Sequence, residues 1–345
     1  MKKNYVISLI LVFITVASVF AQETKKQIKI YPVGFYNLEN LYYPLSTEEK
    51  RDKEFSPEGN KHWTMDKYNK KLANMAHAIS QIAKEYNGVV MLGVSEIGSK
   101  KVLEDLVKTG ELASKGYSIV HHQSPDRRGV SVALLYNPKV YKVTSSTPYP
   151  YILPENPDFK TRDVLLVSGI LSGEPVHVMV NHWPSRYGSK SSELREHAAS
   201  IVKHVTDSIR QADPRAKIII MGDMNDDPTD KSTRIVLDAK KSIKDVKEGG
   251  LYNTMWPLYA KGVGSLNYQG KWNLFDQIII SDNLLGSDRS TLKFWKAEVF
   301  NKDFLIQKEG NYKGYPLRTF RGNTFLNGYS DHFPTLIYLV KEANQ

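Results

Sequence analysis

Two short polar strings, each joined to an apolar run, constrain the fold of this chain more than any other feature. Gly222-Asp223-Met224-Asn225 follows the apolar run 217–221, and Ser330-Asp331-His332 leads into the apolar run 333–340. Short apolar runs are typical of buried β-strands, so the polar residues are expected at strand ends. A carboxylate beside an amide or an imidazole can hold a divalent cation, orient water and move a proton. The two strings together predict a polar site at the edge of a sheet.

The rest of the chain contains many strands and a few helices. Helical spacing of apolar residues predicts helices over 66–86, 101–113 and 191–212, with Thr64 capping the first and a short helix after Pro228. Strands are predicted at 28–36, 88–94, 117–121, 130–136, 140–145, 162–171, 176–181, 217–221, 275–280 and 333–340. The charged stretch 44–62 has no clear period and is expected to be an exposed insertion. This pattern favours one domain of α/β layers, in which two sheets pack face to face under outer helices.

The first 21 residues have the pattern of a secretory signal. Lys2 and Lys3 are followed by the apolar stretch 6–16 and by the small-residue pattern Val19-Phe20-Ala21. We therefore expect residues 1–21 to be a signal peptide and 22–345 to be a single domain, exported to the periplasm or the medium. An uncleaved N-terminal anchor is the alternative interpretation. No later run has the length of a bilayer span, so no stable membrane span is expected.

Composition limits the chemistry and the partners. The chain has no cysteine, so a metal must bind oxygen and imidazole ligands, which favours Mg²⁺, Mn²⁺ or Ca²⁺ over a thiolate zinc centre. The formal net charge is +10, of which Lys2 and Lys3 carry two. A basic exported protein is attracted to polyanions such as nucleic acid or an anionic membrane surface. Charge alone does not separate these partners from a merely solvated lysine-rich surface, and nothing indicates a protein partner.

Six predicted strands end in, or open with, residues suited to metal and phosphate chemistry. These residues are Asn37, Glu96, Asn181-His182, Asp223 with Asn225, Asp276, and Asp331-His332. Strand ends converge on one rim in stacked sheets, so groups far apart in sequence can share a cleft. Asp, Asn and Gly also punctuate strands, which is the ordinary explanation for any single one of them. Their recurrence at six strands favours an active site.

In sequence order, these blocks resemble the endonuclease/exonuclease/phosphatase superfamily, the deoxyribonuclease I-like enzymes. The matching blocks are Tyr36-Asn37, Ser95-Glu96, Asn181-His182, Gly222-Asp223-Met224-Asn225, Asp276 and Ser330-Asp331-His332, and they span essentially the whole mature chain. The resemblance implies a four-layer α/β/β/α sandwich of two packed mixed sheets. It also implies a metal-dependent phosphoester hydrolase that uses Mg²⁺.

The resemblance further implies a metal site and substrate contacts. Glu96 matches the principal metal carboxylate, and Asn37 matches the amide that helps hold the metal or the scissile phosphate. Asp331 matches the carboxylate next to the catalytic histidine, which either lies on the metal side or orients the water, so it is a candidate both as a metal ligand and as a catalytic residue. Arg128 and Arg186 are additional candidates for binding phosphate, because a guanidinium can form two parallel hydrogen bonds to it. Each arginine is equally suited to a surface ion pair.

The remaining matches imply catalytic roles. Asp223 and Asn225 match the pair that orients the attacking water and binds a phosphate oxygen. His332 matches the imidazole that faces the scissile phosphate, and Asp276 matches the partner of its second nitrogen. His182 matches the other active-site histidine. It is followed by Trp183-Pro184-Ser185, an unusual sequence for the family that is expected to reshape the leaving-group side.

Several neighbouring residues have no assigned role at this stage. Tyr268 and Trp272 precede Asp276 and are candidates either for stacking on a base or for simple packing. Glu39 and Asn40 are interpreted as turn and capping groups.

Three interpretations of function are open. The preferred one is an exported nuclease that hydrolyses DNA or RNA without sequence preference. The second is a phosphatase or phospholipase C-type enzyme acting on inositol phosphates or sphingomyelin, although Asp226-Asp227 replaces the Tyr-Arg of the inositol group and no aromatic membrane-inserting hairpin is evident. The third is a binding protein that kept the fold and lost the chemistry. The intact set of acids, amides and histidines argues against the third.

Overall fold

The computed structural model describes residues 27–44, 52–268 and 270–343. The expected signal peptide and residues 45–51 of the expected insertion lie outside the described residues. The helices are α1 (Met65–Gln81), α2 (Lys100–Leu106), α3 (Ser191–Ala212) and α4 (Trp256–Tyr259). The strands are β1 (Ile28–Leu41), β2 (Met91–Ile97), β3 (Ser118–His121), β4 (Ser131–Tyr136), β5 (Tyr141–Tyr149), β6 (Val164–Leu171), β7 (Glu174–His182), β8 (Lys217–Asp223), β9 (Ala239–Lys240), β10 (Leu251–Asn253), β11 (Leu266–Tyr268), β12 (Lys271–Asn273), β13 (Asp276–Ser281), β14 (Lys293–Val299), β15 (Phe320–Arg321), β16 (Thr324–Phe325) and β17 (Thr335–Glu342).

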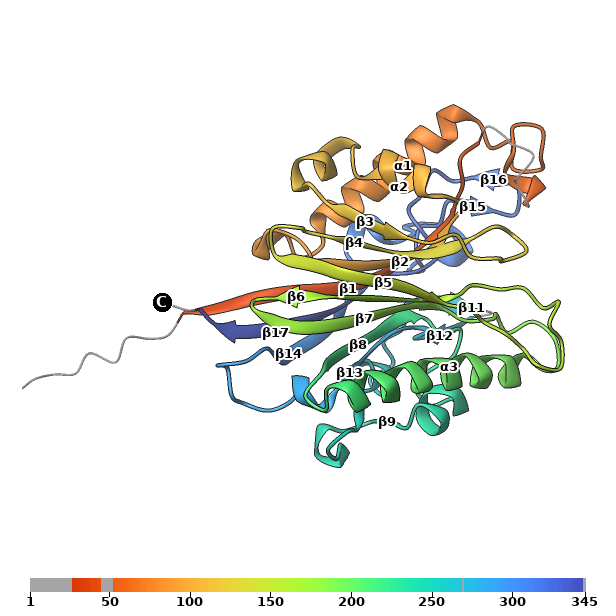
Figure 1. Ribbon diagram of the computed structural model, residues 1–345. Helices are drawn as coiled ribbons and strands as arrows, with labels where there is room; N and C mark the ends of the chain where they lie inside the picture. Colours follow the sequence, from red (N-terminus) through yellow and green to blue (C-terminus); the bar gives the residue numbers. More distant parts are fainter. Residues whose placement is uncertain (1–26, 45–51, 269, 344–345) are drawn as a thin grey trace, which may run out of the picture.

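Two large sheets pack face to face between layers of helix (Figure 1). The six-stranded sheet has the order β14-β17-β1-β2-β4-β3, and the seven-stranded sheet has the order β5-β6-β7-β8-β13-β10-β9. Both are mixed: β1 runs parallel to β2 and antiparallel to β17, and β8 runs parallel to β7 and antiparallel to β13. Helices α1 and α2 cover one outer face and α3 covers the other. The predicted four-layer α/β/β/α sandwich is confirmed.

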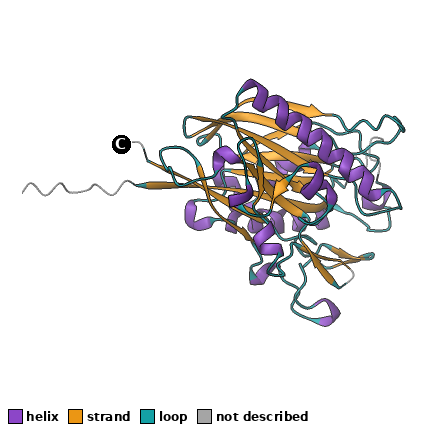
Figure 2. Cartoon of the chain, turned by 90° about the horizontal axis from the view of Figure 1, so that it is seen from below, coloured by secondary structure: helices purple, strands orange, loops and turns teal. Residues whose placement is uncertain are grey.

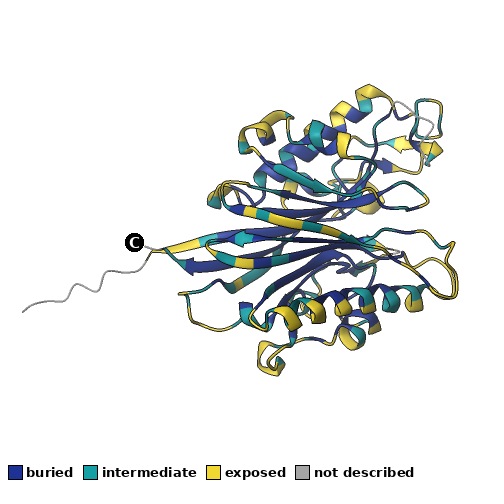
Figure 3. Ribbon diagram, in the orientation of Figure 1, coloured by how far each residue is buried: buried dark blue, intermediate teal, exposed yellow. Residues whose placement is uncertain are grey.

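The outer helices are amphipathic, as their sequences predict. Seen from below, α3 lies across the strands of the seven-stranded sheet (Figure 2). Its inner face buries Ala198, Ala199, Val202 and Val205. Its outer face is largely exposed, whereas the strands between the layers are largely buried (Figure 3). The apolar stripe of each helix therefore fixes it to a sheet and closes the core.

Two predicted helices end earlier than expected. The helix predicted over 66–86 stops at Gln81, because Ile82 is extended and Ala83 takes a left-handed conformation at φ +50° before a short 3₁₀ turn, Lys84–Tyr86. The helix predicted over 101–113 stops at Leu106, and a 3₁₀ segment, Gly110–Lys115, follows. Gly110 has φ +50°. A residue with positive φ does not continue a right-handed helix, and apolar spacing gave no sign of either position.

Two glycines allow the close approaches that the site depends on. A Cβ atom on Gly93 of β2 would lie 2.5 Å from the Met221 sulfur of β8, so the Met221 side chain fills the space between the two sheets that a larger residue at position 93 would need. A Cβ atom on Gly222 would lie 2.3 Å from the Asn181 carbonyl oxygen. The glycine of the Gly-Asp-x-Asn string therefore lets β7 and β8 lie close just before their polar ends.

The expected exposed insertion is partly core. Phe55 is buried and lies edge-on to Trp63 and Phe320, with ring centroids 6.0 Å apart in each pair. The short hairpin β15–β16, which contains Phe320, was not predicted. These aromatic contacts join the stretch after β1 to the segment before β17. None of the helices in the described part of the chain combines the length and apolar character needed to cross a bilayer.

Candidate active site

The seven-stranded sheet brings three of the predicted residues together at one end. β8 lies between β7 and β13, so Asp223 is in register with His182 on one side and with Asp276 on the other. All three side chains are buried. The three residues span positions 182 to 276 and form a row because β7 and β8 end, and β13 begins, at the same rim.

The six-stranded sheet supplies the opposite half of the site. Asn37 of β1 is in register with Ser95, the residue before Glu96. The Ser330 Oγ donates to the Asn37 carbonyl oxygen at 2.7 Å, which fixes the chain just before Asp331-His332. The Asn37 side-chain amide then donates to Asp223 Oδ2 at 3.0 Å. This hydrogen bond crosses from one sheet to the other.

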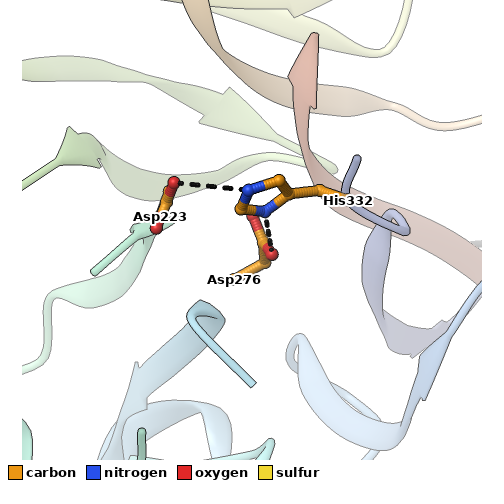
Figure 4. Close-up of side chains that lie close together, drawn as sticks. All are labelled: Asp223, Asp276 and His332. Atoms are coloured by element: carbon orange, nitrogen blue, oxygen red, sulfur yellow. Dashed lines mark hydrogen bonds and ion pairs between the residues drawn. The ribbon is translucent and has the colours of Figure 1, made fainter. Parts of the chain in front are cut away.

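His332 lies between two carboxylates (Figure 4). Its Nδ1 is 2.6 Å from Asp276 Oδ2, and its Nε2 is 3.9 Å from Asp223 Oδ2. The Ser265 hydroxyl also donates to Asp276 Oδ2, which orients that carboxylate. Burial by itself lowers the pKa of His332, but the charges of Asp276 and Asp223 outweigh it and hold the pKa well above the usual value. His332 is therefore a cation at neutral pH.

Asp223 is the central carboxylate. Its Oδ1 accepts from the backbone N–H of Asn225 at 3.0 Å, and its Oδ2 accepts from Asn37. Burial raises the pKa of Asp223 to about 6; the charge of His332 opposes this rise and that of Asp276 adds to it. A carboxylate with a pKa near 6 is ionised at neutral pH and is still basic enough to accept a proton.

His182 has the opposite electrostatic character from His332. Its Nε2 is 3.6 Å from Asp223 Oδ2. Burial lowers the pKa of His182 well below the usual value, and the charges of Arg162, Arg128 and His332 lower it further. The Arg162 guanidinium also holds the His182 backbone, because its Nε donates to the His182 carbonyl oxygen at 3.0 Å. The site thus contains one charged and one neutral imidazole on either side of Asp223.

Asn225 and Trp183 fix the loop beside His182. Asn225 is in the left-handed region at φ +50°, and its Nδ2 donates to the Trp183 carbonyl oxygen at 3.0 Å. Positive φ in a residue other than glycine is uncommon and concentrates at functional sites. The Trp183 ring is 2% exposed and belongs to the core between the seven-stranded sheet and α3. It therefore points away from the site, and the expectation that it reshapes the leaving-group side gains no support.

Glu96 ends the polar row on the six-stranded sheet. It has φ +61°, and its Oε2 accepts from the backbone N–H of Asn40 at 2.8 Å. Its Oε1 lies 3.5 Å from the Arg128 guanidinium. Arg128 therefore forms an ion pair with the predicted metal carboxylate, and its contact with substrate phosphate stays a prediction. Asn40, interpreted as a capping group, instead orients that carboxylate.

Asp223, Asp276 and His332 offer ligand atoms that all lie within 4.8 Å of one another, but they do not suit a metal. The 2.6 Å separation of His332 Nδ1 and Asp276 Oδ2 is that of a hydrogen bond, so both atoms already share a proton. Asp276 is completely buried and accepts a second hydrogen bond. We interpret this set as an acid–base arrangement.

Glu96, Asn37 and Asp331 fit a divalent cation better. They offer carboxylate and amide oxygens, the donors that hard cations prefer. The Glu96 and Asp331 side chains are 13% and 32% exposed, so both can be reached from solvent. In the structure Glu96 pairs with Arg128, and Asp331 pairs with Arg318. Each carboxylate therefore already faces a positive charge, as it would face a bound cation. These three residues would hold the metal.

Comparison with known proteins agrees with this geometry. A model of the endonuclease/exonuclease/phosphatase family matches residues 32–341. The chain belongs to this family. Members of the endonuclease/exonuclease/phosphatase family are metal-dependent phosphoester hydrolases, and this chain is one of them. Comparison with curated proteins gives no match.

Solved structures of the endonuclease/exonuclease/phosphatase family have the same fold. A family protein from Bacteroides thetaiotaomicron is 16% identical with a TM-score of 0.55, over 93% of this chain and 98% of that one. TDP2 from D. rerio, complexed with single strand DNA product, is 13% identical with a TM-score of 0.54, over 90% of this chain and 98% of that one. A mannosyl-6-phosphatase from Bacteroides thetaiotaomicron is 16% identical with a TM-score of 0.54, over 90% of this chain and 99% of that one. At these identities the likeness concerns the fold alone.

Sequence analysis of this family member missed a charged network behind Asp331. The Arg318 guanidinium lies 2.9 Å from Asp331 Oδ2 and 3.2 Å from Glu39 Oε1. Lys71 of α1 is 1% exposed and donates to the Thr319 hydroxyl at 2.5 Å and to the Tyr329 carbonyl oxygen. Burial raises the pKa of Glu39 to about 7 and lowers that of Lys71 to about 8. The network ties the segment before Asp331 to α1.

Arg186 lies among carboxylates after β8. Its guanidinium is 2.6 Å from Asp230, 3.4 Å from Asp227 and 3.6 Å from Asp226, and it stacks 4.3 Å from the centre of the Phe275 ring. These contacts stabilise the loop that carries Asn225. A contact with substrate phosphate stays a prediction for Arg186, and the structure favours the ion-pair alternative.

Proposed function

We propose that this protein is an exported, Mg²⁺-dependent phosphodiesterase that hydrolyses DNA or RNA. One observation carries the proposal: Asp223 is buried between a neutral His182 and a charged His332. Hydrolysis of a phosphodiester needs a group that accepts a proton from water and cations that face the phosphate. This arrangement supplies both at neutral pH.

Each residue has a distinct part in the proposed reaction. Asp223 orients the attacking water and accepts its proton, and Asn37 holds the Asp223 carboxylate in place. His332 donates from Nε2 to a phosphate oxygen while Asp276 holds its Nδ1. His182, the neutral imidazole, donates a hydrogen bond to a phosphate oxygen or to the leaving oxygen. Mg²⁺ held by Glu96, Asn37 and Asp331 would polarise a phosphate oxygen and offset the charge that develops on it.

The basic charge of the chain favours nucleic acid as substrate. The formal net charge is +10 with Lys2 and Lys3 and +8 without them, which attracts polyanions, and one structural relative was solved with single strand DNA product. Export is supported by the signal pattern in residues 1–21. Sequencing the N-terminus of the mature protein from separated cell fractions tests that part: an N-terminus at Gln22 in an exported fraction supports it.

A phosphatase is the second candidate. A pocket of about 420 Å³ beside Glu39 and Asn40 is lined by Lys61, Arg128 and Arg318. The carboxylates of Glu39, Asp52 and Glu54 line the same pocket, so its charges are balanced. Its guanidinium and ammonium groups can still donate hydrogen bonds to the phosphate of a small phosphomonoester. One structural relative is a mannosyl-6-phosphatase.

A substrate panel separates the two. Plasmid DNA, RNA, inositol phosphates, mannose 6-phosphate and sphingomyelin are assayed with Mg²⁺ and with chelator, and with the His332→Ala variant as the inactive control. The nuclease proposal expects metal-dependent cleavage of DNA or RNA that weakens steeply with salt, because phosphate contacts displace counterions. Good turnover of a small phosphomonoester at a rate that does not depend on salt would contradict the nuclease proposal and support the phosphatase.

A further inference from the structure

A second pocket opens beside Asp331, separated from the first by Arg318. Its volume is about 560 Å³, and Arg318 lines both pockets. Its lining includes three tyrosines, an arginine and a glutamine: Tyr268, Tyr312, Tyr315, Arg321 and Gln307. None of them belongs to the acid–base or metal sets described above. A volume between 300 and 1,000 Å³ is typical of small-molecule sites.

We propose that this pocket binds the nucleobase of the nucleotide whose phosphate lies at the active site. The inference rests on the proposed nuclease function and adds a substrate subsite to it. Asp331 lines the pocket and directly precedes His332, so a group in the pocket is next to the reacting phosphate. The occupant is therefore a part of the substrate attached to that phosphate.

Two tyrosine side chains are exposed to solvent here, and one of them, Tyr312, packs against a chain of further rings. Tyr268 and Tyr312 are 54% and 46% exposed, although large aromatic side chains favour burial. Tyr312 lies edge-on to Tyr315 at 5.7 Å, and Tyr315 lies edge-on to Trp272 at 5.9 Å. Trp272 stacks on Phe333 with their planes 16° apart. Trp272 thus packs, and Tyr268 is the member of that pair placed to meet a base.

This chain of rings connects the pocket to the catalytic histidine. Phe333 directly follows His332, and its backbone N–H donates to the Ser265 carbonyl oxygen at 2.7 Å. Ser265 in turn donates to Asp276, the partner of His332. A ring bound against this wall is consequently held at a fixed position relative to the His332 imidazole.

The chemistry of the wall favours a flat aromatic ring over a sugar. The Arg321 guanidinium lies 4.3 Å from the centre of the Tyr312 ring, so a second flat, polarisable surface adjoins the tyrosine. Stacking on aromatic and guanidinium planes accepts any base, because every base has a π-face. Gln307 adds an amide that can bond a base edge. This arrangement suits binding without strong sequence preference.

Equilibrium binding to the full mature chain tests the proposal. Isothermal titration calorimetry compares thymidine 5′-monophosphate with 2-deoxyribose 5-phosphate, which has the same sugar and phosphate but no base. Mannose 6-phosphate is the third ligand. We expect thymidine 5′-monophosphate to bind about tenfold or more tightly than either base-free ligand, since stacking of one base contributes that much.

Matched variants locate the effect. Tyr312→Ala should remove most of the preference for the base, and Tyr312→Phe should keep it because the ring remains. Trp295→Ala is the control: Trp295 is also 46% exposed, with the Lys296 ammonium 4.8 Å from its ring, but it lines neither pocket. If Tyr312→Ala does not fold, Tyr268→Ala replaces it. The ratio of the wild-type affinities for thymidine 5′-monophosphate and 2-deoxyribose 5-phosphate is a further test that needs no variant.

Each result bears on one proposal. Equal binding of the three ligands by the wild type, tighter binding of mannose 6-phosphate, or an unchanged preference in Tyr312→Ala would overturn the base site. If plasmid DNA and RNA are not cleaved but the base preference is present, the nuclease function fails and the base site stands. If nucleic acid is cleaved without any base preference, the function stands and the base site fails.

Discussion

The Nδ1 atom of His332 and the Oδ2 atom of Asp276 lie 2.6 Å apart, although the residues are 56 positions apart in the chain. Asp276 therefore fixes both the orientation and the charge of the imidazole. We predict that Asp276→Asn lowers kcat roughly 10²-fold or more, the usual contribution of one acid–base group, with little change in KM. Steady-state kinetics on the best substrate of the panel measure this. Ser265→Ala should lower kcat in the same way but by a smaller factor. If Asp276→Asn instead raises KM and leaves kcat unchanged, Asp276 does not support the catalytic histidine.

Glu96 should control the metal requirement. Glu96→Ala is expected to abolish hydrolysis, and Glu96→Gln to raise the Mg²⁺ concentration for half-maximal activity, because a neutral amide binds a hard cation less well than a carboxylate. The fold should stay intact, as judged by circular dichroism. Glu85→Gln, an exposed change outside the site, is the control. Full activity of Glu96→Ala would remove this residue from the metal site.

Activity should rise with pH through about 6. Asp223 has a raised pKa of about 6 because it is buried, and it must be ionised to accept a proton. The ionised fraction, and with it kcat, is then expected to increase about tenfold between pH 5 and pH 7. A pH–rate profile at saturating metal and substrate tests this. A rate that is flat over that range, or that falls, would exclude Asp223 as the base.

A cluster away from the site should govern stability in acid. Burial by itself raises the pKa of Glu174, but hydrogen bonds from Lys217, Lys341 and Thr291 outweigh it and lower the pKa from 4.5 to about 2. Because the folded pKa is depressed, this stabilisation is fully present above pH 4.5 and is lost as the pH falls towards 2.

Glu174→Gln should therefore destabilise the protein at neutral pH by about 1–2 kcal/mol, a figure reduced for solvent screening near the surface. The difference from the wild type should shrink as the pH falls from 4.5 towards 2. Urea unfolding at several pH values measures it, with the exposed Glu248→Gln as the control. A constant difference at all these pH values would mean that the ion pairs of Glu174 do not stabilise the fold.

The sequence was informative wherever an apolar strand ended in a polar residue. Asp223, Asp276 and His332 were found because apolar runs mark three buried strands. Pairing of β8 with β13 places Asp223 beside Asp276, and packing of the two sheets brings His332 to them. Arg318 has no such marker. It lies in a stretch without periodicity, and its partner Glu39 is 279 positions away. Contacts of that kind depend on tertiary packing that local patterns do not encode.

Lys71 shows that a sequence pattern can predict the burial of a residue without predicting its partners. It precedes Met75 by four residues and so falls on the apolar face of α1, where helical spacing alone places it in the interior. Its charge led to no functional interpretation, because lysine is rarely buried without a partner and the partners, Thr319 and Tyr329, are far along the chain. The early end of α1 was missed for a related reason: Ala83 adopts its left-handed conformation although alanine favours helix.

The contact of Gly93 with Met221 has a consequence for how this enzyme can fail. The six-stranded sheet carries Glu96, Asn37 and His332, and the seven-stranded sheet carries Asp223, His182 and Asp276. A bulkier residue at position 93, deep in the interior and remote from any substrate, would wedge the halves apart and lengthen the distances between proton donors and acceptors. Such a variant should lose activity while it still unfolds in one cooperative thermal transition. The catalytic rate is therefore more sensitive to packing at position 93 than the melting temperature is.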